Sequence, residues 1–285
     1  MTQITSRIRT SLLAKVNMRI IKITLLMLIV LYLAACGLIY AKQKSMLFPA
    51  QYAKPVPANW QPTAGDSASQ AFINGSCGRI NVVIWNINNA KGTIMMSHGN
   101  GESLASINDY AYAFHNLGYN LMAWDYAGYG RSTDCWFSQN DLLADAESAY
   151  QWLATREKPE KIFIFGYSVG TGIALSVAAH HQQNPVYLVA AYDTLINVAK
   201  DHILPLMPIQ LMMRYPLDTA QFITQMHQPI YLIHGTDDKL IRPARVQALV
   251  DHSHGKARIE WVKGAGHTDD ALFNYRNQWL KRLLP

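Results

Sequence analysis

The chain has 285 residues, 50% of them hydrophobic and 15% charged, which is enough for one α/β domain with a large core or for two small domains. Its net charge is +6, but Arg7, Arg9, Lys15, Arg19 and Lys22 lie in the first 35 residues, which contain no acid. Without those five, the chain has 20 basic and 19 acidic residues, so the body is nearly neutral. This composition argues against a nucleic-acid partner.

A predominantly apolar stretch of 19 residues, 23–41, follows the basic residues. A stretch of this length can cross a bilayer, and basic residues tend to stay on the cytoplasmic side. We therefore predict that residues 1–41 are a membrane anchor or signal and that the body lies outside the cytoplasm, as in a bacterial cell envelope.

The chemical nature of the anchor stays open. L-A-A-C at 33–36 resembles the bacterial lipobox, which would make Cys36 a lipid attachment site, with Met18 as an alternative start. Residues 37–41 remain apolar, however, which favours an uncleaved transmembrane helix in which Cys36 is simply a small apolar residue.

The other cysteines are Cys77, in an expected turn, and Cys135, in an expected loop. A compartment outside the cytoplasm would permit a disulfide between them, but our default expectation is two partly buried free thiols. No cysteine or histidine spacing suggests a zinc site.

After an irregular linker, expected at 42–70, short apolar runs alternate with helical patterns. This alternation predicts an α/β domain at 71–285, with a mostly parallel eight-stranded sheet, helices on both faces and an antiparallel hairpin at the start. The expected strands are 71–73, 80–85, 93–97, 120–124, 161–165, 186–191, 230–233 and 258–262. The expected helices are 107–117, 140–156, a helix starting after residue 168, 243–250 and 269–284, and the segment 195–228 interrupts the alternation.

The motif G-x-S-x-G at 166–170 lies between a β-favouring run and a small, helix-compatible run. In that context the serine sits at a sharp, strained turn, so its hydroxyl projects from the end of the sheet. A Cβ at Gly166 or Gly170 would collide with the neighbouring strand or helix. The motif alone is weak, because a chain of this length would show it by chance in roughly one case in ten. Ser168 is therefore a candidate nucleophile that needs support from the rest of the chain.

A serine hydroxyl needs a base to remove its proton, and that base needs a carboxylate to fix its tautomer. Hydrolases of this kind supply these groups in the order Ser, acid, His, at the carboxyl ends of the strands. Asp237 and Asp238 both follow the strand at 230–233, and Asp193 follows the preceding strand. We favour Asp238, and the other two stay open as alternatives.

The candidate base is His267, which lies in a glycine-bearing loop between the last expected strand and the last expected helix. His234, at a strand end, is predicted to be structural. The negative oxygen of a tetrahedral intermediate needs backbone donors, which we assign to the N–H groups of Val169 and Asn100. This chemistry requires no metal and no organic cofactor.

Five motifs in this order resemble the α/β-hydrolase fold family over roughly residues 70–285. They are H-G-N-G at 98–101, D-Y-A-G-Y-G-R-S at 125–132, G-Y-S-V-G at 166–170, H-G-T-D-D at 234–238 and G-H at 266–267. In the family pattern the acid stands three residues after the strand-end glycine, which from Gly235 is Asp238. The H-G-N-G form, the short middle insertion and the N-terminal anchor resemble one membrane-anchored branch of the family, which includes depalmitoylating thioesterases and serine-aminopeptidase-like hydrolases.

The resemblance implies a serine hydrolase that cleaves an ester, a thioester or, less favoured, an amide of a small-molecule or acylated substrate. It does not choose among these, because the fold hosts many chemistries. The middle insertion is too short for a full cap. Its apolar run at 203–213 could roof an acyl-binding cleft, lie against the membrane or form short helices packed on the core. The alternative function is a non-catalytic binding scaffold at the membrane.

Overall fold

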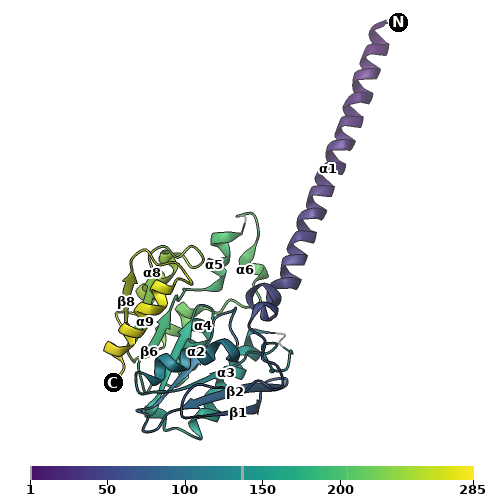
Figure 1. Cartoon of the computed structure of the whole chain (residues 1–285). Coiled ribbons are helices and arrows are strands. Elements are labelled where there is room, and N and C mark those ends of the chain that lie inside the picture. The colour runs from purple at the N-terminus through teal and green to yellow at the C-terminus, as the bar shows by residue number, and fades with distance from the viewer. Residues whose placement is uncertain (1, 136–137, 204) are drawn as a thin grey trace. The chain divides into compact units, whose positions relative to one another are not determined.

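The structure is a computed structural model that describes residues 2–135, 138–203 and 205–285, with side chains described from Asn17 onward (Figure 1). The chain divides into two units, residues 1–44 and residues 45–285. The first unit is helical, and the second contains the whole sheet.

One long helix, α1 (Thr2–Leu47), begins the chain. Its part Asn17–Leu47 is long and apolar enough to cross a membrane, by length and composition. Such a helix at the N-terminus supports membrane association, as predicted.

The predicted irregular linker at 42–70 is partly wrong. Helix α1 continues to Leu47, because the first helix-breaking residue after the apolar stretch is Pro49. A short 3₁₀ turn, η1 (Ala50–Tyr52), follows, and the first strand begins at Ser67. Within the predicted linker, residues 48–49 and 53–66 are irregular.

Eight strands in the described part of the chain form one open sheet, in the order β1-β2-β4-β3-β5-β6-β7-β8. The β1–β2 and β2–β4 pairs are antiparallel, and every other neighbouring pair is parallel. The predicted mostly parallel eight-stranded sheet is therefore confirmed. The strands are β1 (Ser67–Asn74), β2 (Arg79–Asn86), β3 (Thr93–Ser97), β4 (Asn120–Trp124), β5 (Ile162–Tyr167), β6 (Val186–Val189), β7 (Ile230–Gly235) and β8 (Ala257–Val262).

Several strand ends differ from the prediction, and two of these differences have clear local reasons. β1 starts four residues before the predicted 71, because its pairing with β2 continues out to Ser67 opposite Asn86. β6 stops at Val189 because Ala190 adopts a left-handed backbone, with φ of 54°, which a strand cannot accommodate.

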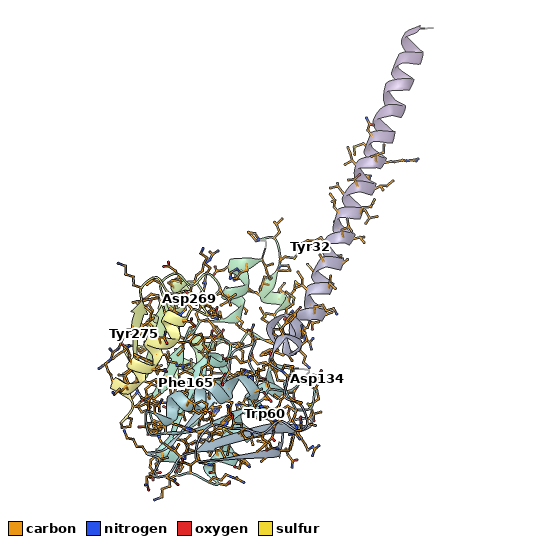
Figure 2. The ribbon with its side chains drawn as sticks, viewed as in Figure 1. Tyr32, Trp60, Asp134, Phe165, Asp269 and Tyr275 are labelled. Atoms are coloured by element: carbon orange, nitrogen blue, oxygen red, sulfur yellow. A yellow bond between two sulfur atoms is a disulfide. The ribbon has the colours of Figure 1, made fainter. Side chains whose placement is uncertain are left out.

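Helices cover both faces of the sheet, as predicted (Figure 1). α2 (Leu104–His115) and α9 (Asp270–Leu283) pack on one face, and α3 (Gln139–Ala154), α4 (Gly170–His180) and α8 (Pro243–His252) pack on the other. Strand side chains alternate between the two cores: Met95 joins one, whereas Ile94 and Met96 join the other. Phe165 on β5, labelled in Figure 2, lies in the core beneath α2 and α9.

The middle insertion holds three short helices among its described residues: α5 (Leu195–His202), α6 (Ile209–Met212) and α7 (Thr219–Thr224). α5 is fastened to α8, because Arg245 donates two hydrogen bonds of 2.7 and 2.8 Å to the carboxylate of Asp201. The insertion is therefore short, as predicted, and is no full cap domain.

Cys77 and Cys135 form a disulfide between positions 58 residues apart. The expectation of two free thiols is therefore wrong. The two loops are brought together next to β2 by backbone and side-chain hydrogen bonds between Arg79 and Thr133, of 2.9 and 3.1 Å. That proximity depends on strand pairing, which cysteine spacing alone does not reveal.

Candidate active site

Ser168 lies at the turn between β5 and α4, in the left-handed backbone conformation with φ of 53°. Such a φ is strained for a serine and persists only when its surroundings enforce it. A Cβ added at Gly166 would lie 2.7 Å from Thr171 Cα, and one at Gly170 would overlap the carbonyl oxygen of Ser97. The two glycines therefore allow strand, turn and helix to approach closely enough to form this turn.

The structure brings Ser168, His267 and Asp238 into one hydrogen-bonded chain. Ser168 Oγ lies 2.9 Å from His267 Nε2, and His267 Nδ1 lies 2.7 Å from Asp238 Oδ2. Because a carboxylate oxygen only accepts, Nδ1 carries the proton and Nε2 is the acceptor that faces the serine. His267 follows β8 and Asp238 follows β7, so neighbouring parallel strands deliver both groups to the same edge of the sheet.

The two alternative acids have other partners. Asp237 is exposed and accepts a hydrogen bond from the Thr236 hydroxyl at 3.0 Å. Asp193 accepts from the Thr194 N–H at 2.8 Å and from the Asn197 amide at 2.6 Å. Of the three acids considered, Asp238 is the one that meets His267.

The carboxylate of Asp238 is fixed from several sides. Its Oδ1 accepts the N–H groups of Leu240 and Ile241 at 2.9 and 2.8 Å, and its Oδ2 lies 3.4 Å from His234 Nε2. Burial would raise the pKa of Asp238, but the hydrogen bond and charge of His267, together with the Ile241 N–H, outweigh it and hold the pKa below its usual 3.8. Asp238 is therefore a carboxylate at neutral pH.

The backbone of the loop at 98–101 is fixed by side chains on both sides. Gly99 O accepts from His98 Nδ1 at 2.7 Å and from the Glu102 N–H at 3.2 Å. The described chain has no cis peptide bond, so the N–H of Asn100 points opposite to the Gly99 carbonyl. Burial lowers the pKa of His98 to about 4, so this histidine is neutral and donates through Nδ1.

Two residues of this loop environment were not identified from the sequence. Glu102 accepts the Gly99 N–H at 2.7 Å, and the Tyr129 hydroxyl donates to Asn100 O at 2.6 Å. Glu102 follows the H-G-N-G motif directly, a position that could have drawn attention. Tyr129 lies within the D-Y-A-G-Y-G-R-S motif at 125–132, and nothing in that motif indicates a contact with this loop.

Val169 is the first residue after Ser168 and occupies the N-cap position of α4. The first N–H groups of a helix have no partner within the helix and carry a partial positive charge. Its carbonyl accepts a 3.2 Å hydrogen bond from the Tyr192 hydroxyl, which restrains the following peptide. An amide at this place is suited to binding a negative oxygen beside Ser168.

A pocket of about 360 Å³ opens at Ser168 and His267. Its wall is largely aromatic, from Tyr110, Tyr167 and Phe273, and it includes Leu240 and the loop at 99–102. His267 is held in this wall by its carbonyl, which accepts from the Tyr167 hydroxyl at 3.1 Å. The pocket offers an apolar surface next to the Ser168 hydroxyl, of the kind that an acyl group would fit.

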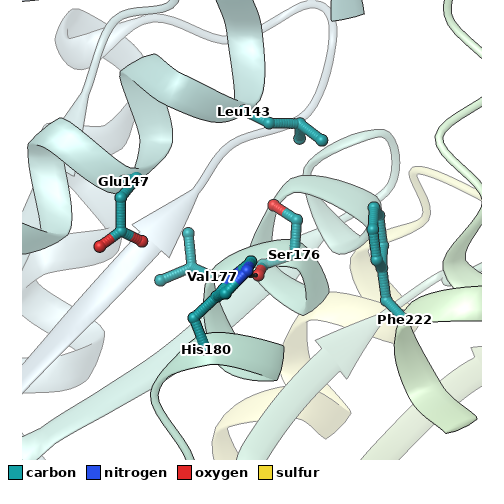
Figure 3. A pocket seen from close by; sticks show the side chains of 6 residues that line it. All are labelled: Leu143, Glu147, Ser176, Val177, His180 and Phe222. Carbon is teal, nitrogen blue, oxygen red and sulfur yellow. Dashed lines mark hydrogen bonds between the residues drawn. The ribbon is translucent and has the colours of Figure 1, made fainter. Parts of the chain in front are cut away.

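A second pocket, of about 330 Å³, lies between α3, α4 and α7 and does not include the serine, histidine and aspartate described above (Figure 3). Its polar groups are already engaged: the Ser176 hydroxyl donates to Ile173 O, and His180 Nδ1 lies 2.9 Å from Ser176 O. Glu147 also faces this pocket and pairs with His181 at 2.9 Å. This second pocket lacks a nucleophile with an adjacent base, so the chemistry points to the first.

Asp125 connects the end of β4 to the start of α2. Its Oδ1 accepts the Leu104 N–H at 2.9 Å, and its carbonyl accepts from the Ser132 hydroxyl at 2.6 Å. Burial raises the pKa of Asp125 from 3.8 to about 7. The folded chain therefore binds this proton more tightly than the unfolded chain does.

We expect Asp125→Asn to change the pH dependence of stability. The protonated form of Asp125 favours folding at acidic pH, and this contribution is lost as pH rises from about 4 through about 7. Asparagine does not titrate, so the unfolding free energy of the variant relative to wild type should increase by about 2–3 kcal/mol from about pH 5 to about pH 8. Denaturant titrations at both pH values measure this difference, and a constant difference would contradict the raised pKa.

Comparison with solved structures establishes the fold. A Pyrococcus furiosus esterase superposes with a TM-score of 0.62 at 19% identity, covering 82% of this chain and 99% of that one. A thioesterase domain from the curacin biosynthetic pathway superposes with a TM-score of 0.56 at 15% identity, covering 76% and 99%. The chain therefore has the α/β-hydrolase fold.

Sequence comparison places the chain near particular α/β-hydrolases. Human alpha/beta hydrolase domain-containing protein 17B is 30% identical over 203 residues, 68% of this chain and 66% of that protein. A Mycobacterium tuberculosis protein is 27% identical over 185 residues, 64% of this chain and 65% of its own length. The chain thus spans about two thirds of the length of these relatives.

The family described as serine aminopeptidase, S33, matches residues 88–215, which include Ser168 but neither Asp238 nor His267. Together these similarities confirm the expected resemblance to α/β-hydrolase fold serine hydrolases and support hydrolase activity.

Proposed function

We propose that the protein is a serine hydrolase that cleaves a carboxylic ester or thioester, or less readily an amide, through an acyl-enzyme. The observation that carries this proposal is the continuous hydrogen-bonded chain from Ser168 Oγ through His267 to Asp238. This chain begins at a strained turn and opens onto an apolar pocket.

The geometry supports the following sequence of steps. Ser168 Oγ attacks the substrate carbonyl carbon as its proton passes to His267 Nε2, and Asp238 stabilises the imidazolium that results. His267 returns the proton to the leaving group, which departs and leaves an ester on Ser168. Water then attacks that ester as His267 takes its proton, and His267 gives this proton to Ser168 Oγ as the carboxylic acid leaves.

The N–H groups of Asn100 and Val169 are proposed to bind the negative oxygen of each tetrahedral intermediate. The Asn100 N–H is aimed away from the loop interior by the contacts of Gly99 O with His98 and Glu102. Donors fixed before reaction need no reorganisation when charge develops, and one such donor contributes roughly 10²–10³ in rate.

We further propose that the body works outside the cytoplasm, tethered by α1. The basic residues precede the apolar stretch, and the body contains the Cys77–Cys135 disulfide, which fits an oxidising compartment such as a bacterial cell envelope. Cys36 lies inside the continuous helix α1, which favours an uncleaved helix over lipid attachment at Cys36.

A fluorophosphonate probe tests the catalytic role, because it reacts covalently only with an activated serine. We expect the wild-type protein to be labelled and Ser168→Ala to lose the label, while the thermal unfolding midpoints of the two proteins stay similar. Absence of label on folded wild-type protein, or equal labelling of Ser168→Ala, would overturn the proposal in favour of a non-catalytic scaffold.

A further inference from the structure

Leu206, which precedes α6, and Leu211, on α6, present apolar side chains to solvent. Leu206 is 83% exposed and Leu211 is 88% exposed, although both are large aliphatic residues. Isolated exposed leucines are common on protein surfaces, but two strongly exposed leucines within one short insertion place a large apolar area there that could contact an apolar surface. We refer to residues 205–213 as the insertion surface.

The insertion surface lies near the point at which the chain enters the catalytic unit. Phe48 and Tyr215, both in that unit and both buried, pack edge to face with ring centroids 5.5 Å apart. Tyr215 follows Leu211 by four residues, which span at most about 14 Å of chain. Leu211 is therefore within reach of the first residues of the body.

Those first residues follow directly on the apolar stretch of α1. The stretch ends at Ala41, and the helix continues to Leu47, immediately before Phe48. At 1.5 Å rise per residue, Phe48 is about 10 Å along the chain from the end of the apolar stretch. If the stretch spans a bilayer, Phe48 is at the depth of the lipid headgroups.

We propose that the insertion surface inserts Leu206 and Leu211 into the bilayer that α1 crosses, so that the body takes acylated substrates from that membrane. The partner is thus a lipid surface, and the substrate class is an acyl ester or thioester resident in it. The substrate class rests on the proposed function, because it assumes that acylated substrates are hydrolysed in the pocket at Ser168.

A hydrogen bond links α5 to the pocket at Ser168, so membrane contact by the insertion could affect how substrate enters that pocket. His202, the last residue of α5, lies with Nε2 2.8 Å from the carbonyl of Leu240, and Leu240 lines the pocket. Asp201 holds the same helix to Arg245 on α8. Helix α5, which precedes the insertion surface in the chain, is therefore held both to the pocket wall and to α8.

Activity on two substrates tests the proposal in the full-length protein reconstituted into phosphatidylcholine vesicles. For Leu206→Ser/Leu211→Ser we expect hydrolysis of water-soluble p-nitrophenyl acetate within about twofold of wild type, but at least about tenfold slower hydrolysis of a long-chain acyl thioester embedded in the vesicles. Tyr112→Ser, at a 52% exposed position on α2, is the matched control and should leave both rates unchanged. Equal rates for wild type and the double variant on the embedded substrate would overturn the proposal.

A second measurement does not depend on catalysis. A fluorophore on Leu211→Cys, in a Cys36→Ser background, should be quenched by brominated phosphatidylcholine, whereas the same fluorophore on Tyr112→Cys should not. Quenching with no hydrolysis of either substrate would keep the membrane contact and reject the hydrolase. No quenching at Leu211→Cys would reject the contact, even in an active enzyme, and would leave a protein partner as the occupant of this surface.

Discussion

Replacing Asp238 with asparagine is expected to lower kcat by about four orders of magnitude, with the fold retained. The Asp238 carboxylate accepts a 2.7 Å hydrogen bond from the protonated Nδ1 of His267. An asparagine amide can instead donate to Nδ1, which moves the ring proton to Nε2 and removes the acceptor that Ser168 needs. Steady-state ester hydrolysis measures the loss, and thermal unfolding checks that the protein remains folded.

Asp237→Asn is the matched control, because this neighbouring acid is exposed and bonds to Thr236 rather than to His267. We expect its kcat to stay within about threefold of wild type, as for most surface substitutions. Asp193→Asn should likewise spare catalysis, although its bonds to Thr194 and Asn197 make a stability measurement necessary. A loss at Asp193 or Asp237 as large as that at Asp238 would reassign the acid.

The proximity of Asp238 and His267 could be predicted from the sequence because parallel strands bring their carboxyl ends to one edge. Asp238 and His267 directly follow two strands that pair with each other, so order along the chain translates into proximity in space. The rank among Asp193, Asp237 and Asp238 was harder, since a shift of one residue changes the direction of a side chain. In the structure, the hydrogen bond to His267 is made by Asp238, whereas Asp237 and Asp193 bond to other residues.

Other features depend on contacts that chain order does not encode. The direction of the Asn100 N–H depends on the hydrogen bond between His98 Nδ1 and the Gly99 carbonyl. It also depends on the Tyr129 hydroxyl, 29 residues further along the chain, which donates to the Asn100 carbonyl. The Cys77–Cys135 bond likewise depends on how the loop after β4 returns to β2. The extension of α1 to Leu47 was predictable in principle, because no breaker precedes Pro49, but the end of the apolar stretch was taken as the end of the helix.

Gly170→Ala is expected to be the most damaging of the small substitutions around the nucleophile. A Cβ at this position would overlap the carbonyl oxygens of Ser97 and His98, which are backbone atoms that cannot rotate away. Either β3 and the loop after it move, or the turn at Ser168 moves. We expect a loss of at least about 3 kcal/mol in unfolding free energy, as for overpacked cores. Fluorophosphonate labelling should also slow by at least about 10²-fold, because small misplacements of a reacting group are costly.

Gly101→Ala is the control that distinguishes this steric clash from a general sensitivity of the pocket to any glycine substitution. A Cβ at Gly101 has no atom within 4 Å, although Gly101 belongs to the same pocket. Its unfolding free energy should stay within about 0.5 kcal/mol of wild type. Similar losses for Gly170→Ala and Gly101→Ala would mean that the close approach of α4 to β3 does not hold Ser168 in its strained conformation. A selective loss at Gly170 would show that this packing, rather than the serine's own preference, maintains the φ of 53° on which the proposed nucleophile depends.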